Sequence, residues 1–449
     1  MNVKFYIGIQ TKYKLIYYMS LFVLLFVCLQ IQAQEKKIFF NLQEVLSYVK
    51  TKNSSFQNAT IQTKLAELTY KSSIGNVINP RIPTSAQLLD NTKQQVSYLP
   101  AEAFGGPAGT FKEAKIGLQY VSTFSLQPQF DILNLANIAQ IKSAKINLEL
   151  NDNQNKINEK KVYDQLNAIY FNILSYEAQK EIINDHIEIA QKILQVTQNK
   201  FTEGVARKQE VNEAEVNLIS LQDKFQQLDL NLQMQYQSFA LFFENTVDAD
   251  IRQSVWDFEK TNEPLQTNTK LLAQNNLLQL KMAQQDLRVA RYQNVPVISF
   301  TSSFNWQNLS NNGLFHKDSR WTDYNFVGVK LNWDLPTNIQ KLTTSKNKAY
   351  QIDILKNNVL HSDLENQTAN IQMGIEYQKA LNQLSNMKKI YELKKDSYEK
   401  NYNQFVENIL ALDKLLISQN DLLASRINVI TSLANIGFNK NKIVINNEF

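Results

Sequence analysis

A run of about 70 residues without glycine or proline constrains this chain more than any other feature, because at ~1.5 Å of rise per residue it predicts a helix about 100 Å long. The run extends from Ile132 to Glu203. A helix of that length does not fit inside a compact domain. Its apolar residues recur every three or four positions, with Lys180 as the one break, as in the seam of a coiled coil.

A second apolar seam follows this run. It begins at Val211 and reaches Phe242, with Gln235 as its exception. Between the two seams lies Gly204, and glycine enters left-handed conformations freely, which lets a chain reverse its direction. The pattern therefore predicts an antiparallel hairpin of two long helices. The apolar stripes are interpreted as packing surfaces and not as a cofactor site.

The chain also repeats itself. Residues Phe201–Leu218 align with Phe405–Leu422 at an offset of 204 residues. Two further pairs of segments match at a similar distance, namely Phe124–Phe130 with Val329–Leu335 and Asn79–Ile82 with Val295–Ile298. A repeat of this length indicates a duplicated structural half, because solenoid units recur at about 20 to 50 residues.

The repeat predicts a second helical hairpin. Its helices are expected at 341–404 and 412–438, with a turn near Glu407 and Asn408. Composition agrees with long elements, since the 449 residues include only 11 glycines and 8 prolines, whereas about 7% and 5% are usual. The net charge of +5 is small and spread along the chain, so it predicts no nucleic-acid partner.

Residues 1–33 have the pattern of a signal peptide. Lysines precede an almost wholly apolar stretch, 15–29, which is shorter than the ~20 residues of a spanning helix. The only cysteine, Cys28, lies in this stretch, and its lipidation is the alternative, which the bulky Val27 before it disfavours. A mature chain without cysteine would form no disulfide. Beyond the leader, Asn41 and Glu44 predict the capped start of a helix that reaches Gly75.

Four stretches between the helices alternate apolar and polar residues, the fourth, from Ile82 to about Tyr98, more weakly than the others. The apolar positions of the three clear stretches are Ile116, Leu118 and Tyr120; Ile298, Phe300, Phe304 and Trp306; and Val327, Val329, Leu331 and Trp333. One apolar and one polar face suit a barrel strand between lipid and an aqueous lumen, although a half-buried hairpin alternates too. Phe300, Trp306, Val329 and Trp333 are the residues predicted to face lipid.

Strands in a membrane must close into a barrel, because an open edge leaves backbone groups unpaired in hydrocarbon. Four strands are too few, since the smallest barrels have about eight. A cyclic assembly would solve this by pooling the strands of several chains into one barrel and their helices into a tube.

Several motifs resemble those of the TolC-type outer-membrane efflux proteins. The most specific is the first helical turn, where Lys200–Gly204 is followed by Glu210, Val211, Glu213, Ala214 and Leu218. Others are Leu42–Leu46, Ser125–Asp131 and Gly328–Pro336, and the resemblance covers essentially the whole mature chain.

The resemblance implies an α+β membrane protein. Long antiparallel coiled-coil helices would form a periplasmic α-barrel, and four strands per protomer would contribute to a trimeric, 12-stranded outer-membrane β-barrel. Residues 34–259 would form the first structural repeat and 260–449 the second. Barrel strands are then expected at about 80–130 and 295–336, and the hairpins at about 132–245 and 338–440.

The two helical turns are the candidate sites that the resemblance implies. Gly204, Val205, Asn408 and Ile409 would form the tip at which a periplasmic adaptor docks, and Glu407, Asp413 and Lys414 are candidates for a gate or selectivity ring. The sequence departs from the family at the second turn, where Asn408 replaces the usual glycine and Lys414 an aspartate. A solvated charge on a coiled coil is the alternative for Glu407 and Asp413.

No catalytic set, phosphate-binding loop, cofactor motif or metal-ligand spacing is evident. The three histidines are far apart, and His186 is expected to be a surface residue rather than a ligand. The resemblance therefore implies no enzyme but a passive homotrimeric channel in the outer membrane of a Gram-negative bacterium, with a large periplasmic part. It would be the exit duct of a tripartite efflux or type I secretion system, joined by an adaptor to an inner-membrane transporter.

The main alternative is the periplasmic adaptor itself, which is also exported and bears a helical hairpin. An adaptor should have one hairpin and glycine-rich lipoyl-like modules, whereas this chain has two predicted hairpins and barrel-like strands. The sequence does not reveal the cargo or the particular pump.

Overall fold

The computed structural model describes residues 35–244, 247–260, 265–267, 270–335, 337 and 339–449. The predicted signal peptide and Cys28 lie outside the described residues. The chain forms two compact units, and each draws on both halves of the sequence. Unit 1 comprises residues up to Ile61 together with Asn155–Leu271 and Asp363–Phe449, and unit 2 comprises Gln62–Gln154 and Leu272–Ser362.

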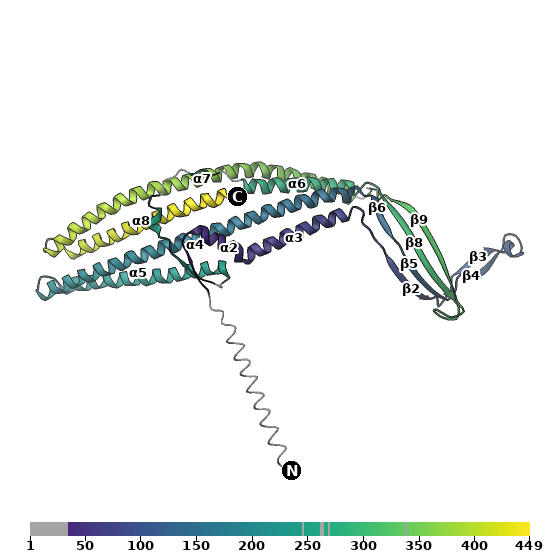
Figure 1. Cartoon of the computed structure of the whole chain (residues 1–449), viewed down its shortest axis with the longest axis horizontal. Coiled ribbons are helices and arrows are strands. Elements are labelled where there is room, and N and C mark those ends of the chain that lie inside the picture. The colour runs from purple at the N-terminus through teal and green to yellow at the C-terminus, as the bar shows by residue number, and fades with distance from the viewer. Residues whose placement is uncertain (1–34, 245–246, 261–264, 268–269, 336, 338) are drawn as a thin grey trace, which may run out of the picture. The chain divides into compact units, whose positions relative to one another are not determined.

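Four long helices carry the repeat. They are α4 (Leu135–Thr202), α5 (Lys208–Ala240), α7 (Ile339–Val406) and α8 (Leu412–Asn447). Helices α4 and α7 each have 68 residues, and both α7 and α8 begin 204 residues after their counterparts α4 and α5. The α4–α5 and α7–α8 pairs lie antiparallel in unit 1 (Figure 1), and the first parts of α4 and α7 belong to unit 2. The two predicted hairpins are confirmed.

Within the described residues there are also three shorter α-helices, namely α2 (Leu42–Lys52), α3 (Ser54–Gly75) and α6 (Leu271–Tyr292). The predicted cap is present, because Asn41 accepts a hydrogen bond from the Glu44 N–H at 2.9 Å and the Glu44 carboxylate accepts one from the Phe40 N–H at 2.9 Å. The predicted single helix divides at Asn53, whose buried side chain donates to the carbonyl oxygen of Phe242 at 3.0 Å.

A five-stranded antiparallel sheet lies in unit 2 (Figure 1). Its strands are β2 (Thr84–Asp90), β5 (Tyr120–Leu126), β6 (Gln129–Leu133), β8 (Val297–Ser310) and β9 (Arg320–Asn332). Strands β5 and β6 both pair with β8 and are two parts of one path, interrupted at Pro128, which has no N–H to donate. The sheet therefore has four continuous strand paths, and β2 and β9 form its edges.

A separate hairpin of β3 (Val96–Pro100) and β4 (Phe111–Lys115) lies between β2 and β5 in the sequence, with a short 3₁₀ helix, η1 (Ala101–Phe104), before its loop. The strand predicted around Ile116, Leu118 and Tyr120 is wrong for its first part. Gly117 has a φ of +98°, a left-handed value that interrupts an extended strand, so β4 ends before it and β5 begins after it.

The core of unit 1 forms where short elements pack on the long helices. Strands β1 (Glu35–Phe39) and β7 (Val247–Ile251) pair in parallel, near the 3₁₀ helices η2 (Leu241–Phe243) and η3 (Val255–Phe258). The fully buried Phe39 stacks on Phe243 with ring centroids 5.5 Å apart, and Phe171 packs edge-on against Phe258 at 5.1 Å. No helix within the described residues is long and apolar enough to cross a membrane.

Candidate functional site: a two-faced sheet and two helical tips

The strand register places the four predicted lipid-facing residues on one face of the sheet. Phe300 pairs with Val329 on β9 and with Phe130 on β6, and Trp306 pairs with Phe124 on β5. Trp333 continues the same alternation one residue beyond β9. Phe300 and Phe130 stack with centroids 4.7 Å apart. We call this surface, which also includes Ile298, Phe304 and Leu331, the aromatic face.

The opposite face of the sheet is mostly polar. Ser299, Thr301, Ser303, Asn305 and Gln307 of β8 alternate with the aromatic face, and Lys330 of β9 pairs with Ser299. The division is incomplete near the 311–319 loop, because Asp323 and Asn325 lie on the aromatic face and Tyr324 and Phe326 on the polar one. The predicted alternation is therefore correct over the strand segments farther from this loop.

The two helical tips have the same backbone. At the first tip the N–H groups of Gly204 and Val205 donate to the carbonyl oxygens of Phe201 and Lys200 at 3.1 and 2.8 Å. At the second tip Asn408 and Ile409 donate to Phe405 and Gln404 at 3.1 and 2.8 Å. This pair of bonds is the Schellman motif, which satisfies the last carbonyls of a helix.

Both tips turn through a left-handed residue. The φ angle is +74° at Gly204 and +62° at Asn408. Asparagine is one of the few side chains that adopt this conformation readily, because its short amide can hydrogen-bond locally. The substitution of Asn408 for glycine thus changes the residue and retains the turn.

The helices that follow the tips begin differently. At the start of α5 the Glu210 carboxylate accepts a hydrogen bond from the Arg207 N–H at 2.9 Å, which satisfies one of the free donors of a helix N-terminus. The counterpart of Glu210, 204 residues later, is Lys414, which has no acceptor to offer. The second tip therefore lacks this cap.

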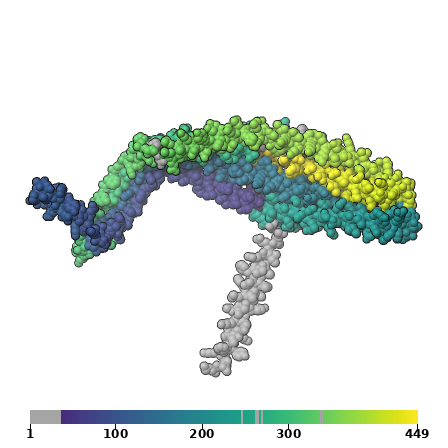
Figure 2. All heavy atoms as spheres, turned by 180° about the vertical axis from the view of Figure 1, so that it is seen from behind, coloured from purple at the N-terminus to yellow at the C-terminus, as the bar shows by residue number. Residues whose placement is uncertain are grey.

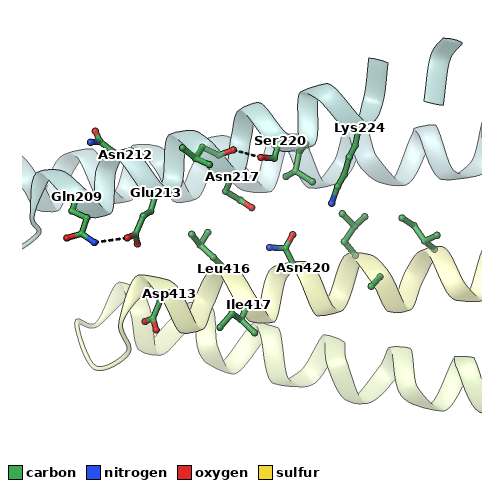
Figure 3. A pocket seen from close by; sticks show the side chains of 15 residues that line it. Gln209, Asn212, Glu213, Asn217, Ser220, Lys224, Asp413, Leu416, Ile417 and Asn420 are labelled. Atoms are coloured by element: carbon green, nitrogen blue, oxygen red, sulfur yellow. Dashed lines mark hydrogen bonds between the residues drawn. The ribbon is translucent and has the colours of Figure 1, made fainter. Parts of the chain in front are cut away.

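A groove of about 880 Å³ runs between α5 and α8 next to the tips (Figure 3). Asp413 lies at the end near the α8 turn, and Glu213 and Gln209, hydrogen-bonded to each other at 3.0 Å, lie across from it on α5. Lys224 extends into the groove farther along. Of the three gate candidates, the structure places Asp413 on this groove, and Glu407 and Lys414 are exposed.

Lys200 links the two tips, although the sequence analysis assigned it no such contact. Its ammonium lies over the Phe405 ring, 3.9 Å from the centroid, and donates to the carbonyl oxygen of the same residue. Burial lowers the pKa of Lys200, and the charges of Glu210 and Glu203 oppose that shift. The only sequence feature that could have indicated this contact is a lysine just before the turn. Its partner, Phe405, is 205 residues away in the sequence.

The expectation that His186 is a surface residue is wrong. Its side chain is 1% exposed, because α8 packs on this part of α4. Burial, and then the charge of Arg426, lower the His186 pKa to about 4, and Asp185 opposes this shift. The imidazole is therefore neutral at neutral pH. Among the described residues, no group of three or more histidine, cysteine, aspartate or glutamate side chains is arranged to hold a metal ion.

The fold is thus of one class: two long helical hairpins combined with an antiparallel sheet whose two faces differ. Solved structures share it over most of their length. The outer membrane protein VceC from Vibrio cholerae matches with a TM-score of 0.63 and 12% identity, over 90% of this chain and 95% of that one. The CmeC outer membrane channel of Campylobacter jejuni matches with a TM-score of 0.63 and 16% identity, over 90% and 85%.

The open state of the MtrE outer membrane channel of Neisseria gonorrhoeae matches with a TM-score of 0.68 and 12% identity, over 90% of this chain and 88% of that one. No family model and no curated protein sequence matches the chain. At these identities the comparisons establish the fold. The chain has the α+β fold of the TolC-type outer-membrane channels, and the fold predicted from the sequence is confirmed.

Proposed function

We propose that this chain is one subunit of a homotrimeric, passive channel in a bacterial outer membrane. The observation that carries the proposal is the sheet, with one aromatic face, one polar face and two open edges. A sheet of this kind suits a barrel wall, with lipid outside and water inside. Phe300, Trp306, Val329 and Trp333 would then contact lipid.

The edges of the sheet support closure by further copies of the chain. Neighbouring strand paths are antiparallel, so the edge strands β2 and β9 run in opposite directions. Edge β9 of one copy can therefore pair with edge β2 of the next in the same antiparallel sense. Three copies with four strand paths each would give a closed barrel of 12 strands.

The helical hairpins would form the periplasmic conduit, and their tips would meet an adaptor that connects to an inner-membrane transporter. Gly204, Val205, Asn408 and Ile409 form two matching turns, and Val205 and Ile409 are 58% and 69% exposed, as expected of apolar contacts with a partner. An adaptor itself is disfavoured as the function, because the chain has two hairpins and only 11 glycines.

The proposal is tested by purifying the protein in detergent, measuring its mass, and recording conductance in a planar bilayer. A trimeric mass and discrete channel steps are expected. A monomer without conductance would contradict the proposal.

The membrane face is tested by a matched pair of neighbours on β9. Val329→Lys should impair assembly in the outer membrane, because a lysine at mid-bilayer costs about 2 to 4 kcal/mol. Lys330→Val, on the polar face, should assemble normally. Assembly is read as heat-resistant trimer in outer-membrane fractions, and equal tolerance of both changes would refute the assigned face.

The gate candidates are tested by ion selectivity. If Asp413 lines the conduit, Asp413→Ala should weaken cation preference, and if Lys414 lines it, Lys414→Ala should strengthen that preference. Glu407→Gln is the comparison at the turn itself. Reversal potentials in a salt gradient report the change, and unchanged values in all three variants would remove these residues from the gate.

A further inference from the structure

One half of the sheet has two aromatic side chains on the face that is otherwise polar. The loop 311–319 joins β8 to β9, and the aromatic residues lie on β9 in the half of the sheet near this loop. Tyr324 pairs with Asn305 of β8, and Phe326 pairs with Ser303. Residues that pair directly across two antiparallel strands project from the same face, so both rings lie on the polar face.

Both rings project beyond their polar neighbours. Tyr324 and Phe326 are each 54% exposed, whereas Ser303 and Asn305 are 3% and 5% exposed. The Asn305 amide donates to the Ser303 hydroxyl at 2.8 Å and to the carbonyl oxygen of Tyr324 at 3.4 Å, so its donors are already used. The two rings are two residues apart on one strand, about 7 Å, so one flat ligand can contact both.

The accessible charges on the polar face are positive. Arg320 and Lys330 lie on this face of β9, on either side of the two rings, and both side chains are exposed. The acid on this face, Asp131, is 5% exposed, because Ser299 donates to it at 2.9 Å and Arg81 pairs with it at 3.4 Å. Strands β2, β5 and β8, all within the described residues, contribute no charged side chain to the polar face.

The strand that carries the rings is an edge of the sheet. Figure 2 shows β9 in green along one side of the sheet and β2 in dark blue along the other. In the barrel proposed above, β9 would pair with β2 of the next copy. That strand would bring Ser85, Gln87 and Leu89 of the partner subunit to the polar face. None of the three is charged, so the neighbouring copy would add no acid beside the cations of β9.

We propose that Tyr324 and Phe326, with Arg320 and Lys330 on either side of them, form a binding site on the lumen wall for organic anions that carry an aromatic ring. The proposal rests on the channel proposed above and specifies the class of cargo that its lumen holds. The ring of the ligand would stack on Tyr324 or Phe326, and its negative charge would be attracted by the cations. Lumen side chains of a barrel determine its selectivity.

The cations act through their field more than through contact. Each lies four residues from the nearer ring, about 14 Å along the strand, and its long flexible side chain can shorten that distance. The screening length is about 10 Å in 0.1 M salt, and a lumen lined by one sign of charge focuses the field. The rings therefore determine how strongly a ligand binds, and Arg320 and Lys330 determine which sign of charge is preferred.

The ligand class is tested in planar bilayers, in about 0.1 M salt, with three probes that separate the ring from the charge. Naphthalenesulfonate has both features, cyclohexanesulfonate has the charge without an aromatic ring, and naphthylmethylammonium has the ring with the opposite charge. Naphthalenesulfonate should reduce the channel current at a concentration about tenfold lower than either of the others. No reduction by naphthalenesulfonate, or equal reduction by all three, would overturn the proposal.

The rings are tested by a double variant and a matched control. Tyr324→Thr combined with Phe326→Thr should weaken the block by naphthalenesulfonate about tenfold, because both stacking surfaces are lost. Gln87→Thr shortens a side chain on the same face without removing a ring, and it should keep the wild-type block. A wild-type block in the double variant, or an equal loss in Gln87→Thr, would exclude the two rings as the site.

The charges are tested by a pair of variants on one strand. Lys330→Gln should weaken the block about threefold, whereas Asp323→Asn, which changes a charge on the aromatic face, should leave it unchanged. Equal effects of the two changes would overturn the role of the cations. Current steps recorded before any probe is added separate this proposal from the proposed function. A protein that conducts without distinguishing the probes would refute the binding site alone, and the absence of steps would contradict both.

Discussion

The two helical hairpins of this chain have nearly the same backbone and different chemistry. Their turns share the Schellman hydrogen bonds and a left-handed residue, yet Gly204 at one turn is Asn408 at the other, and Glu210 becomes Lys414. The difference extends along the helices, where the buried His186 corresponds to the exposed Ile390. The repeat thus preserves the path of the chain, and each half has its own contacts.

The largest expected difference between the halves is in folding stability at low pH. The first half buries a histidine, His186, at a position where the second half has the exposed Ile390. The pKa of His186 is about 4 in the folded protein, against about 6.5 when unfolded. The unfolded chain therefore binds the proton first as the pH falls. The contribution of neutral His186 to the free energy of unfolding is fully present above pH 6.5. It is lost as the pH falls from 6.5 to 4, by up to about 3 kcal/mol.

His186→Ile introduces the residue found at the counterpart position, Ile390. It should remove the loss of stability that His186 causes between pH 6.5 and 4. Unfolding midpoints of the purified protein in detergent, measured from pH 7 to pH 4, report it. The exposed His361 provides the control, since His361→Gln should retain the wild-type pH profile. A His186→Ile profile that matches wild type would show that the buried imidazole does not cause the sensitivity.

The next largest difference concerns packing at Gly437 and its counterpart Gln233. A Cβ at Gly437 would be 2.1 Å from the Phe171 ring, so Gly437→Ala forces the ring or the helix to move. We expect a destabilisation of about 1 to 3 kcal/mol. Gln233→Ala, at an exposed site, should stay within about 0.5 kcal/mol of wild type. Denaturant midpoints in detergent compare the two, and similar values would argue against close packing of α4 on α8.

A smaller difference is expected at the turns. Gly204→Ala places a Cβ in the left-handed region and should cost about 1 kcal/mol, whereas Asn408→Gly should be neutral or slightly stabilising. The thermal midpoint and the amount of trimer in the outer membrane are the measurements. If Asn408→Gly were the more damaging change, the Asn408 side chain would have a role beyond tolerating the turn.

The smallest effect concerns the helix start after each turn. Lys414→Glu should give α8 the cap that Glu210 gives α5, and it should raise stability by about 0.5 to 1 kcal/mol. Glu210→Ala should lower stability by a similar amount. A loss of stability in Lys414→Glu would show that Lys414 makes a contact that the comparison of the two halves does not include.

The spacing of apolar residues predicted those parts of the fold that depend on a single helix or strand. The long hairpins, the Asn41 cap and the alternation around Phe300 and Val329 follow from spacings that a rod or a two-faced sheet requires. The turn at Asn408 was predicted from the repeat, since asparagine alone is a weak turn signal.

Features that depend on distant segments were missed. Strands β1 and β7 have five residues each, and their pairing joins Glu35 to Val247 across the chain. Helix α6 matches α3 in length, with 22 residues, but the sequence analysis did not predict it. The burial of His186 depends on the packing of α8, and the contact of Lys200 with Phe405 depends on the packing of α7. A local pattern contains neither.

The equal length of α4 and α7 has a consequence for how a protein of this kind can change in size. Removing two helical turns from α4 would withdraw its tip by about 10 Å, and α5 would need the same deletion to keep its turn. The other hairpin would then project beyond the first, and the two turns would no longer stand level. Reach can therefore change only in matched steps across all four long helices, so a family of such proteins would be expected to vary in length by whole heptads rather than by single residues.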